Sequence, residues 1–207
     1  MKRCDYLLVL SPPRNFEKFV SSEKRFAKRI IGRFDSMGSI GHITITNFFN
    51  KNDYQIEPQF NSLQRKISTL PRLNLRINGY DYFESTGGKT IYIKPIVGKF
   101  EQEWFNQISD HVKRSEIVPH ITIAKGISDE QFDKLWPIFK DKECSDSFFV
   151  DYLTILKRNT YGPDNYYIIF KKLKFKNERL LAPFVYKNRK RRSAPRNSFW
   201  GIQTFLF

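Results

Sequence analysis

Cysteines and long apolar runs are the features this chain has least of. It holds only Cys4 and Cys144 among 207 residues. These are too few for a disulfide framework and lack the paired spacing of a zinc or redox site, so both are expected to be buried thiols. No segment approaches the roughly 20 consecutive apolar residues of a membrane-spanning helix. The first apolar run, Tyr6 to Leu10, is shorter than the hydrophobic region of a signal peptide and stops at Pro12. We therefore expect a soluble cytoplasmic protein with no membrane partner.

Positive charge and aromatic side chains are abundant instead. The formal net charge is +15, with 40% hydrophobic and 16% aromatic residues. That hydrophobic content excludes intrinsic disorder and predicts a buried core. The length suits one large domain or two small lobes better than two independent domains. A strongly positive field favours polyanions such as RNA or anionic lipid, although charge alone does not choose between them.

The first half of the chain predicts alternating strands and helices. A strand over 6–10 precedes an amphipathic helix over 15–33, and a strand rich in Ile, Thr and Phe follows over 41–49. Helical spacing of apolar residues then spans 58–70, before Pro71. Two further strands, 73–83 and 90–97, read as a hairpin whose turn contains Gly87 and Gly88. The Gly-Gly-Lys-Thr sequence there lacks the spacing of a phosphate-binding loop.

From Gly98 the same order of elements begins again. We expect a helix over 100–112, a strand over 119–127, a helix from Ser128, and a closing hairpin of 147–156 and 166–175. The prediction is an α+β fold with two similar lobes of antiparallel sheet, helices packed outside, and a central cleft. Residues 1–176 would form this bilobal domain.

The remaining stretch, 177–207, reads as a basic, aromatic-rich extension. Its cluster of Arg189, Lys190, Arg191 and Arg192 is either a solvated basic loop or a contact to an RNA backbone. An anionic lipid surface is a weaker alternative, because no amphipathic basic helix accompanies the cluster.

A repeated tetrapeptide is the most informative feature. The chain has three histidines, and two of them open identical sequences, His42-Ile43-Thr44-Ile45 and His120-Ile121-Thr122-Ile123. Strand side chains alternate between faces, so each histidine and its threonine share one face while the isoleucines enter the core. If the lobes face each other, two imidazoles and two hydroxyls converge on a space that fits a phosphate.

This pattern indicates acid–base chemistry on a phosphodiester. Imidazole can act as acid or base near neutral pH, so one histidine can deprotonate a nucleophile while the other protonates the leaving oxygen. The hydroxyls of Thr44 and Thr122 can donate to the non-bridging oxygens. A metal site is disfavoured, since neither motif has His-x₃-His spacing or an acidic or cysteine neighbour. His111, near a predicted helix end, is expected to be a surface or capping residue.

Paired His-x-Thr-x motifs in the two halves of an α+β protein resemble the two-histidine phosphoesterase superfamily, which includes the 2′,5′-RNA ligases and 2′,3′-cyclic phosphodiesterases. The resemblance spans about 6–175 and implies cofactor-free action on RNA or nucleotides carrying a cyclic phosphate or a 2′,5′-linkage. His42, Thr44, His120 and Thr122 take its catalytic positions, and Lys125 matches the basic residue often found after the second motif. The family usually leaves a 2′-phosphate, with the first-motif histidine as acid and the second as base.

The sequence leaves alternatives for the activity. Hydrolysis and ligation are opposite directions at one site, and a non-catalytic RNA-binding module is the alternative from another class. One of Phe48 and Phe49, just past the first motif, is expected to line the cleft mouth and contact substrate. We expect a monomer.

Overall fold

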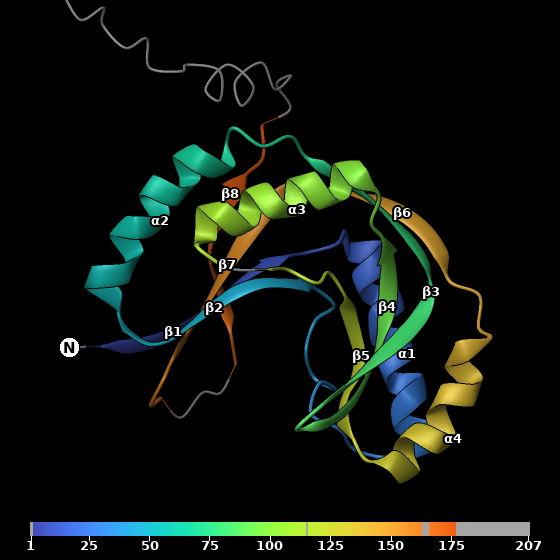
Figure 1. Ribbon diagram of the computed structural model, residues 1–207. Helices are drawn as coiled ribbons and strands as arrows, with labels where there is room; N and C mark the ends of the chain where they lie inside the picture. The colour runs from blue at the N-terminus through green and yellow to red at the C-terminus, as the bar shows by residue number, and fades with distance from the viewer. Residues whose placement is uncertain (1, 115, 163–165, 177–207) are drawn as a thin grey trace, which may run out of the picture.

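The computed structural model describes residues 2–114, 116–162 and 166–176, which form eight strands and four helices (Figure 1). In chain order these are β1 Arg3–Leu10, α1 Arg14–Ile31, β2 Ile43–Asn52, α2 Asp53–Ile67, β3 Leu73–Ser85, β4 Gly88–Ile96, α3 Lys99–Val112, β5 Ile121–Ile127, α4 Asp129–Lys140, β6 Ser145–Val150, β7 Tyr152–Asn159 and β8 Ile168–Lys174. The basic cluster at 189–192 lies outside the described residues. Among those described, no helix is long and apolar enough to span a membrane.

The helices form where apolar spacing predicts them. The capping box at the start of α4 is present, with the Gln131 backbone N–H donating to Ser128 Oγ at 3.3 Å. Only α2 departs from expectation, because it begins at Asp53 and contains Pro58, where the helix was expected to start. Pro58 is the sixth residue of α2 and lies past the first turn, so its lack of an N–H removes one backbone hydrogen bond from the helix.

The strands form two antiparallel sheets of equivalent design. The first has the order β2-β1-β7-β8 and the second β5-β4-β3-β6. In each sheet the strand that carries a His-x-Thr motif is an edge strand: β2 lies beside β1, and β5 lies beside β4. The fold class is thus as predicted, mixed α and β with two antiparallel sheets.

The assignment of strands to lobes differs from the prediction. The expected single strand 147–156 is wrong, because the chain breaks at Asp151 into β6, paired with β3, and β7, paired with β1. The two halves of the sequence therefore exchange strands: the β3–β4 hairpin from the first half joins the sheet of the second motif, and the β7–β8 hairpin from the second half joins the sheet of the first. A run of β-forming residues cannot show this crossing, because periodicity carries no information about strand partners.

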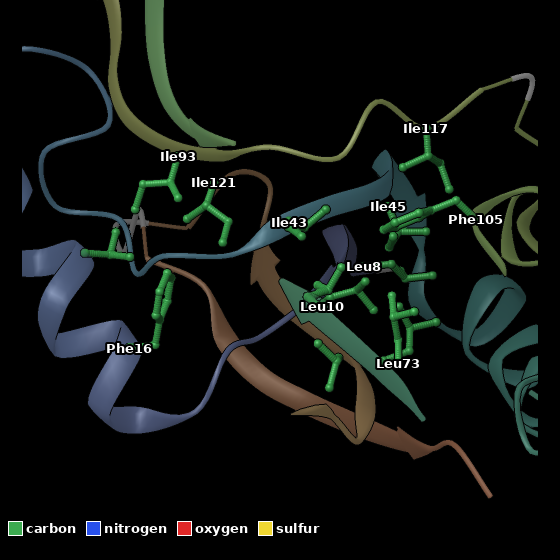
Figure 2. Close-up of a cluster of buried hydrophobic side chains, with 14 of the residues drawn as sticks. Leu8, Leu10, Phe16, Ile43, Ile45, Leu73, Ile93, Phe105, Ile117 and Ile121 are labelled. Atoms are coloured by element: carbon green, nitrogen blue, oxygen red, sulfur yellow. The ribbon is translucent and has the colours of Figure 1, made fainter. Parts of the chain in front are cut away.

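Helices cover the sheets in two pairs (Figure 1). α1 packs against α4 and β5, and α4 also contacts β3 and β4; α2 packs against α3, β2 and β8. The motif isoleucines are part of the core between these layers: Ile43 and Ile45 lie near Leu8, Leu10 and Phe105, and Ile121 lies beside Ile93, its partner on β4 (Figure 2). Burying one such side chain contributes about 1.5–3 kcal/mol. The core thus holds both motif strands by their isoleucines.

Candidate active site

Both His-x-Thr motifs stand at the start of an edge strand. His42 immediately precedes β2 and His120 immediately precedes β5. The four motif isoleucines are at most 1% exposed, whereas the two histidines and two threonines are half-buried. The predicted alternation is therefore present in both motifs, with the isoleucines in the core and the chemically active side chains away from it.

The two imidazoles are held in the same way. His42 Nδ1 lies 2.7 Å from the carbonyl oxygen of Ile40, and His120 Nδ1 lies 2.8 Å from that of Val118. A carbonyl oxygen only accepts, so Nδ1 must carry the proton and donate in each case. This fixes the tautomer and leaves both Nε2 atoms for a ligand.

A β-bulge interrupts each motif at its second isoleucine. On β2, Thr44 pairs with Val9 but Thr46 pairs with Leu8, so Ile45 has no partner on β1. On β5, Thr122 pairs with Tyr92 but Ala124 pairs with Ile91, so Ile123 is likewise skipped. Bulges reverse the alternation of faces and often stand beside active sites, where they redirect side chains.

The second bulge decides where Lys125 points. In a regular strand Lys125 would lie on the face opposite Thr122. Because the bulge at Ile123 inserts one residue, Lys125 shares the face of Thr122, and its charge is near enough to lower the pKa of His120. Because of the bulge, Lys125 can act on a ligand held at Thr122 and His120. A strand without the bulge would have to bend to bring Lys125 to that face.

The two motifs also brace each other. Ser36 Oγ donates to the carbonyl oxygen of Ile123 at 3.2 Å, and Arg114 Nη1 donates to that of Ile45 at 2.8 Å. Both acceptors are the bulged isoleucines, and both donors lie six residues before a motif histidine. Each connection that leads into one motif therefore holds the bulge of the other, which fixes the position of the two motifs relative to each other.

A buried lysine anchors the connection that carries Ser36. Lys24, on α1, is 2% exposed, and its ammonium donates to Ser36 O, Ser39 O and Ser39 Oγ at 2.7–2.9 Å. Ser36 Oγ in turn accepts from the Lys125 backbone N–H at 3.1 Å. No carboxylate is paired with Lys24 among the described residues, and burial lowers its pKa to about 8. A buried cation held without a counter-ion is typical of a functional site.

Both motif histidines are poised to be neutral. Burial lowers the pKa of His42, and the charges of Lys24 and His120 lower it further. Burial also lowers the pKa of His120, with the charges of Lys125 and Arg114 acting in the same direction. In each case the backbone carbonyl bound at Nδ1 opposes the shift. The hydrogen bonds from Ser36 to Ile123 and from Arg114 to Ile45 link the segments that carry these two rings.

Aromatic rings flank the second histidine. The ring centroids of Phe83 and Tyr92 lie 5.2 and 5.6 Å from that of His120. The two phenylalanines after the first motif lie elsewhere: Phe48 is half-buried against Phe60 at 6.2 Å, and Phe49 is 54% exposed. The aromatic surface at His120 thus comes from β3 and β4.

Sequence reasoning missed Arg114, Ser36, Lys24 and Phe83. One signal was available for the first two, because aligning the motifs places Ser36 opposite Arg114. Within the described residues, no group of three or more His, Cys, Asp or Glu side chains is arranged to hold a metal. His111 lies in the last turn of α3, the position expected for it, and its side chain is half-buried.

Comparisons with known proteins bear on the family and the fold. Residues 38–162 match the model of the 2′-5′ RNA ligase superfamily. A Staphylococcus aureus (strain Newman) protein named "Putative phosphoesterase" is 23% identical over 157 residues, covering 72% of this chain and 88% of the relative. Escherichia coli LigT complexed with 3′-AMP superposes with a TM-score of 0.55 at 12% identity, covering 84% of this chain and 98% of LigT. TT0787 of Thermus thermophilus gives a TM-score of 0.55 at 12% identity over 85% and 99% of the two chains.

The matched segment contains both motifs and more than half of the chain, and the structural neighbours have the same fold. The protein therefore belongs to the 2′-5′ RNA ligase superfamily of two-histidine phosphoesterases.

Proposed function

We propose that this protein is a metal-independent phosphodiesterase that opens 2′,3′-cyclic phosphates of RNA or nucleotides to 2′-phosphates. The observation that carries the proposal is the pair of imidazoles, each fixed with a proton on Nδ1 and a free Nε2. Two such groups in one site supply the base and the acid of an in-line displacement.

The reaction balances with these groups alone. A water oxygen attacks phosphorus as the bond from phosphorus to O3′ breaks, leaving a 2′-phosphate and a 3′-hydroxyl. Neutral His120 takes the proton from water at Nε2, and protonated His42 gives its Nε2 proton to O3′, following the assignment that the family resemblance implies. Each transfer contributes about 10²- to 10⁴-fold in rate.

Hydroxyl and cationic side chains stabilise the negative charge that develops on the phosphate oxygens in the transition state. The hydroxyls of Thr44 and Thr122 share a face with the histidines and donate to the non-bridging oxygens. Lys125 and Arg114 act electrostatically on His120 and so stabilise a phosphate held against that ring. No cofactor enters this scheme.

The pH dependence of kcat/KM is the first prediction. Catalysis needs one protonated imidazole, yet both pKa values lie below the usual 6.5. In the free enzyme the acid loses its proton as pH rises through its lowered pKa, so kcat/KM is expected to peak below about pH 6.5 and to fall above it. Bound phosphate favours the imidazolium, so the alkaline limb of kcat should lie at higher pH. Steady-state kinetics from pH 4.5 to 9 test this, and a kcat/KM optimum above pH 8 would contradict it.

The second prediction concerns the cross-brace from Arg114. Replacing Arg114 with alanine removes the hydrogen bond to Ile45 and the charge beside His120. We expect kcat/KM to fall by about 10- to 100-fold, the equivalent of roughly 1.4–2.8 kcal/mol. Because Arg114 lowers the pKa of His120, the pH profile should also move upward in pH.

The exposed Arg65 on α2 provides the matched control, since Arg65→Ala removes the same charge away from the motifs. Arg114→Lys keeps the charge but not the forked donor, and should recover part of the pH shift and little of the rate. An unchanged pH profile in Arg114→Ala would show that this side chain has no electrostatic influence on His120.

Ligation to form 2′,5′-linkages is the reverse reaction at the same site, because a catalyst accelerates both directions. A crystal structure of Escherichia coli LigT holds 3′-AMP, which supports a nucleotide ligand for a protein of this fold. Substrate concentration, not a different set of residues, decides which direction dominates.

Product analysis tests the proposed function. EDTA-treated protein is incubated with 2′,3′-cyclic AMP, and the phosphorus-31 spectrum is followed. Conversion to 2′-AMP alone is expected. Formation of 3′-AMP would overturn the regiochemistry, and loss of turnover on EDTA treatment that added metal restores would overturn the metal-independent mechanism.

A further inference from the structure

A cavity of about 380 Å³ lies between α2, the end of α3 and β2. Ten residues line it: Phe48, Ile56, Gln59, Phe60, Ser62, Leu63, Lys66, His111, Val112 and Lys113. The size falls within the range of small-ligand sites, which are mostly apolar with a few polar groups at defined places. None of the catalytic side chains proposed above belongs to it.

The lining combines an apolar floor with a positive rim. Ile56, Phe60 and Leu63 are at most 8% exposed, while Lys66 and Lys113 are exposed at the opening. Neither lysine forms an ion pair among the described residues, and no lining residue is acidic. Burial and the charge of Lys66 lower the pKa of His111, so this imidazole is a neutral hydrogen-bonding group at pH 7. Such a lining fits a flat aromatic group attached to phosphates.

The cavity is connected to the two histidines by the chain itself. Phe48 follows Thr44 by four residues on β2, roughly 13 Å at the rise of a strand. Lys113 adjoins Arg114, which bonds to Ile45 and acts on His120. Cationic side chains thus lead from the second histidine to the cavity. A stacked strand advances about 3.4 Å per nucleotide, so a ligand that spans both places has several nucleotides.

We propose that this cavity binds a nucleobase of single-stranded RNA, upstream of a 3′-terminal cyclic phosphate held at His42 and His120, with neighbouring phosphates on Lys66 and Lys113. The inference rests on the proposed function and deepens it, because it makes the substrate an oligonucleotide end instead of a mononucleotide. A terminal cyclic phosphate leaves only the 5′ side of the strand to extend, and the cationic path to the cavity accommodates that extension.

The test compares two substrates, 2′,3′-cyclic UMP and a hexauridylate ending in a 2′,3′-cyclic phosphate. Lys66→Gln combined with Lys113→Asn removes the rim charge, and asparagine suits the left-handed backbone of Lys113, whose φ is 57°. Ser62→Trp fills the cavity from an exposed helical position without changing charge. Lys134→Gln combined with Lys140→Gln on α4 is the matched control, because it removes two charges from the other helix pair.

We expect the wild type to have a KM for the hexamer about tenfold below that for the mononucleotide. Both cavity variants should abolish this advantage and leave kcat/KM for cyclic UMP unchanged, while the control keeps it. In the Lys66→Gln/Lys113→Asn variant the salt dependence of hexamer binding should also weaken, by about 0.7 in log–log slope for each lysine that contacts a phosphate. A hexamer advantage that survives in both cavity variants, or is missing from the wild type, would overturn the proposal.

If the wild type turns over neither substrate, the proposed function fails, and fluorescence anisotropy of a labelled hexauridylate decides the cavity separately. Weaker binding in both cavity variants but not in the α4 control would uphold the nucleobase site. Equal binding in all four proteins would overturn it.

Discussion

Replacing His42 or His120 with alanine is expected to lower the kcat for a 2′,3′-cyclic nucleotide by about 10²- to 10⁴-fold. Each substitution removes one of the two proton transfers, and the fixed Nδ1–H of both rings makes Nε2 the only atom able to perform them. Because the two groups act in one step, the double variant should be little worse than the poorer single variant. Single-turnover kinetics on 2′,3′-cyclic AMP measure this.

His111→Ala is the matched control, since His111 is the third and last histidine of the chain and belongs to the cavity beside α3. Its turnover of the mononucleotide should equal that of the wild type. Retained turnover in either His42→Ala or His120→Ala, in a protein with an unchanged circular dichroism spectrum, would refute acid–base catalysis by the pair.

The second large effect is on stability and comes from Lys24. Burial lowers the pKa of Lys24 from 10.5 to about 8, so the folded protein binds this proton less tightly than the unfolded chain. Below pH 8 both states hold the proton, and burying the charge costs about 3 kcal/mol relative to a neutral side chain. Between pH 8 and 10.5 the folded state releases the proton while the unfolded state keeps it, and the cost disappears.

Urea unfolding of the wild type and Lys24→Met across pH 7–10.5 measures this linkage. The unfolding free energy of the wild type is expected to rise by about 3 kcal/mol relative to the variant over that range. Other titrating groups cancel in the difference, and Lys28→Met, at an exposed position of the same helix, is the control that should show no such trend. A pH-independent difference for Lys24→Met would mean that this lysine is not buried as a charge.

Much of the local structure was predictable because it depends on short-range patterns. The four helices follow apolar spacing and the capping box at Ser128. The alternation within the motifs buries Ile43 and Ile121 and leaves the histidines beside them for chemistry. The identical tetrapeptides therefore indicated both the repeat and the site.

Non-local pairing set the limit of prediction. Nothing in the segment 147–156 shows that Asp151 separates strands of different sheets. The bulges at Ile45 and Ile123 depend on how β2 and β5 pair with β1 and β4. Counting residues from Thr122 therefore could not predict the face on which Lys125 lies. In the sequence, Lys24 is one of several basic residues of an amphipathic helix. Only the fold shows that its ammonium donates to Ser36 and Ser39, in the segment that leads to His42.

Histidine NMR tests the central claim most directly, because a protein labelled with nitrogen-15 histidine gives only three imidazole spin systems. The two motif rings should both be in the Nδ1–H tautomer, and titration with 2′-AMP should shift their two Nε2 signals with one shared dissociation constant. An Nε2–H tautomer in either ring, or a nucleotide that shifts only one of the two signals, would contradict a site in which both histidines face the same phosphate.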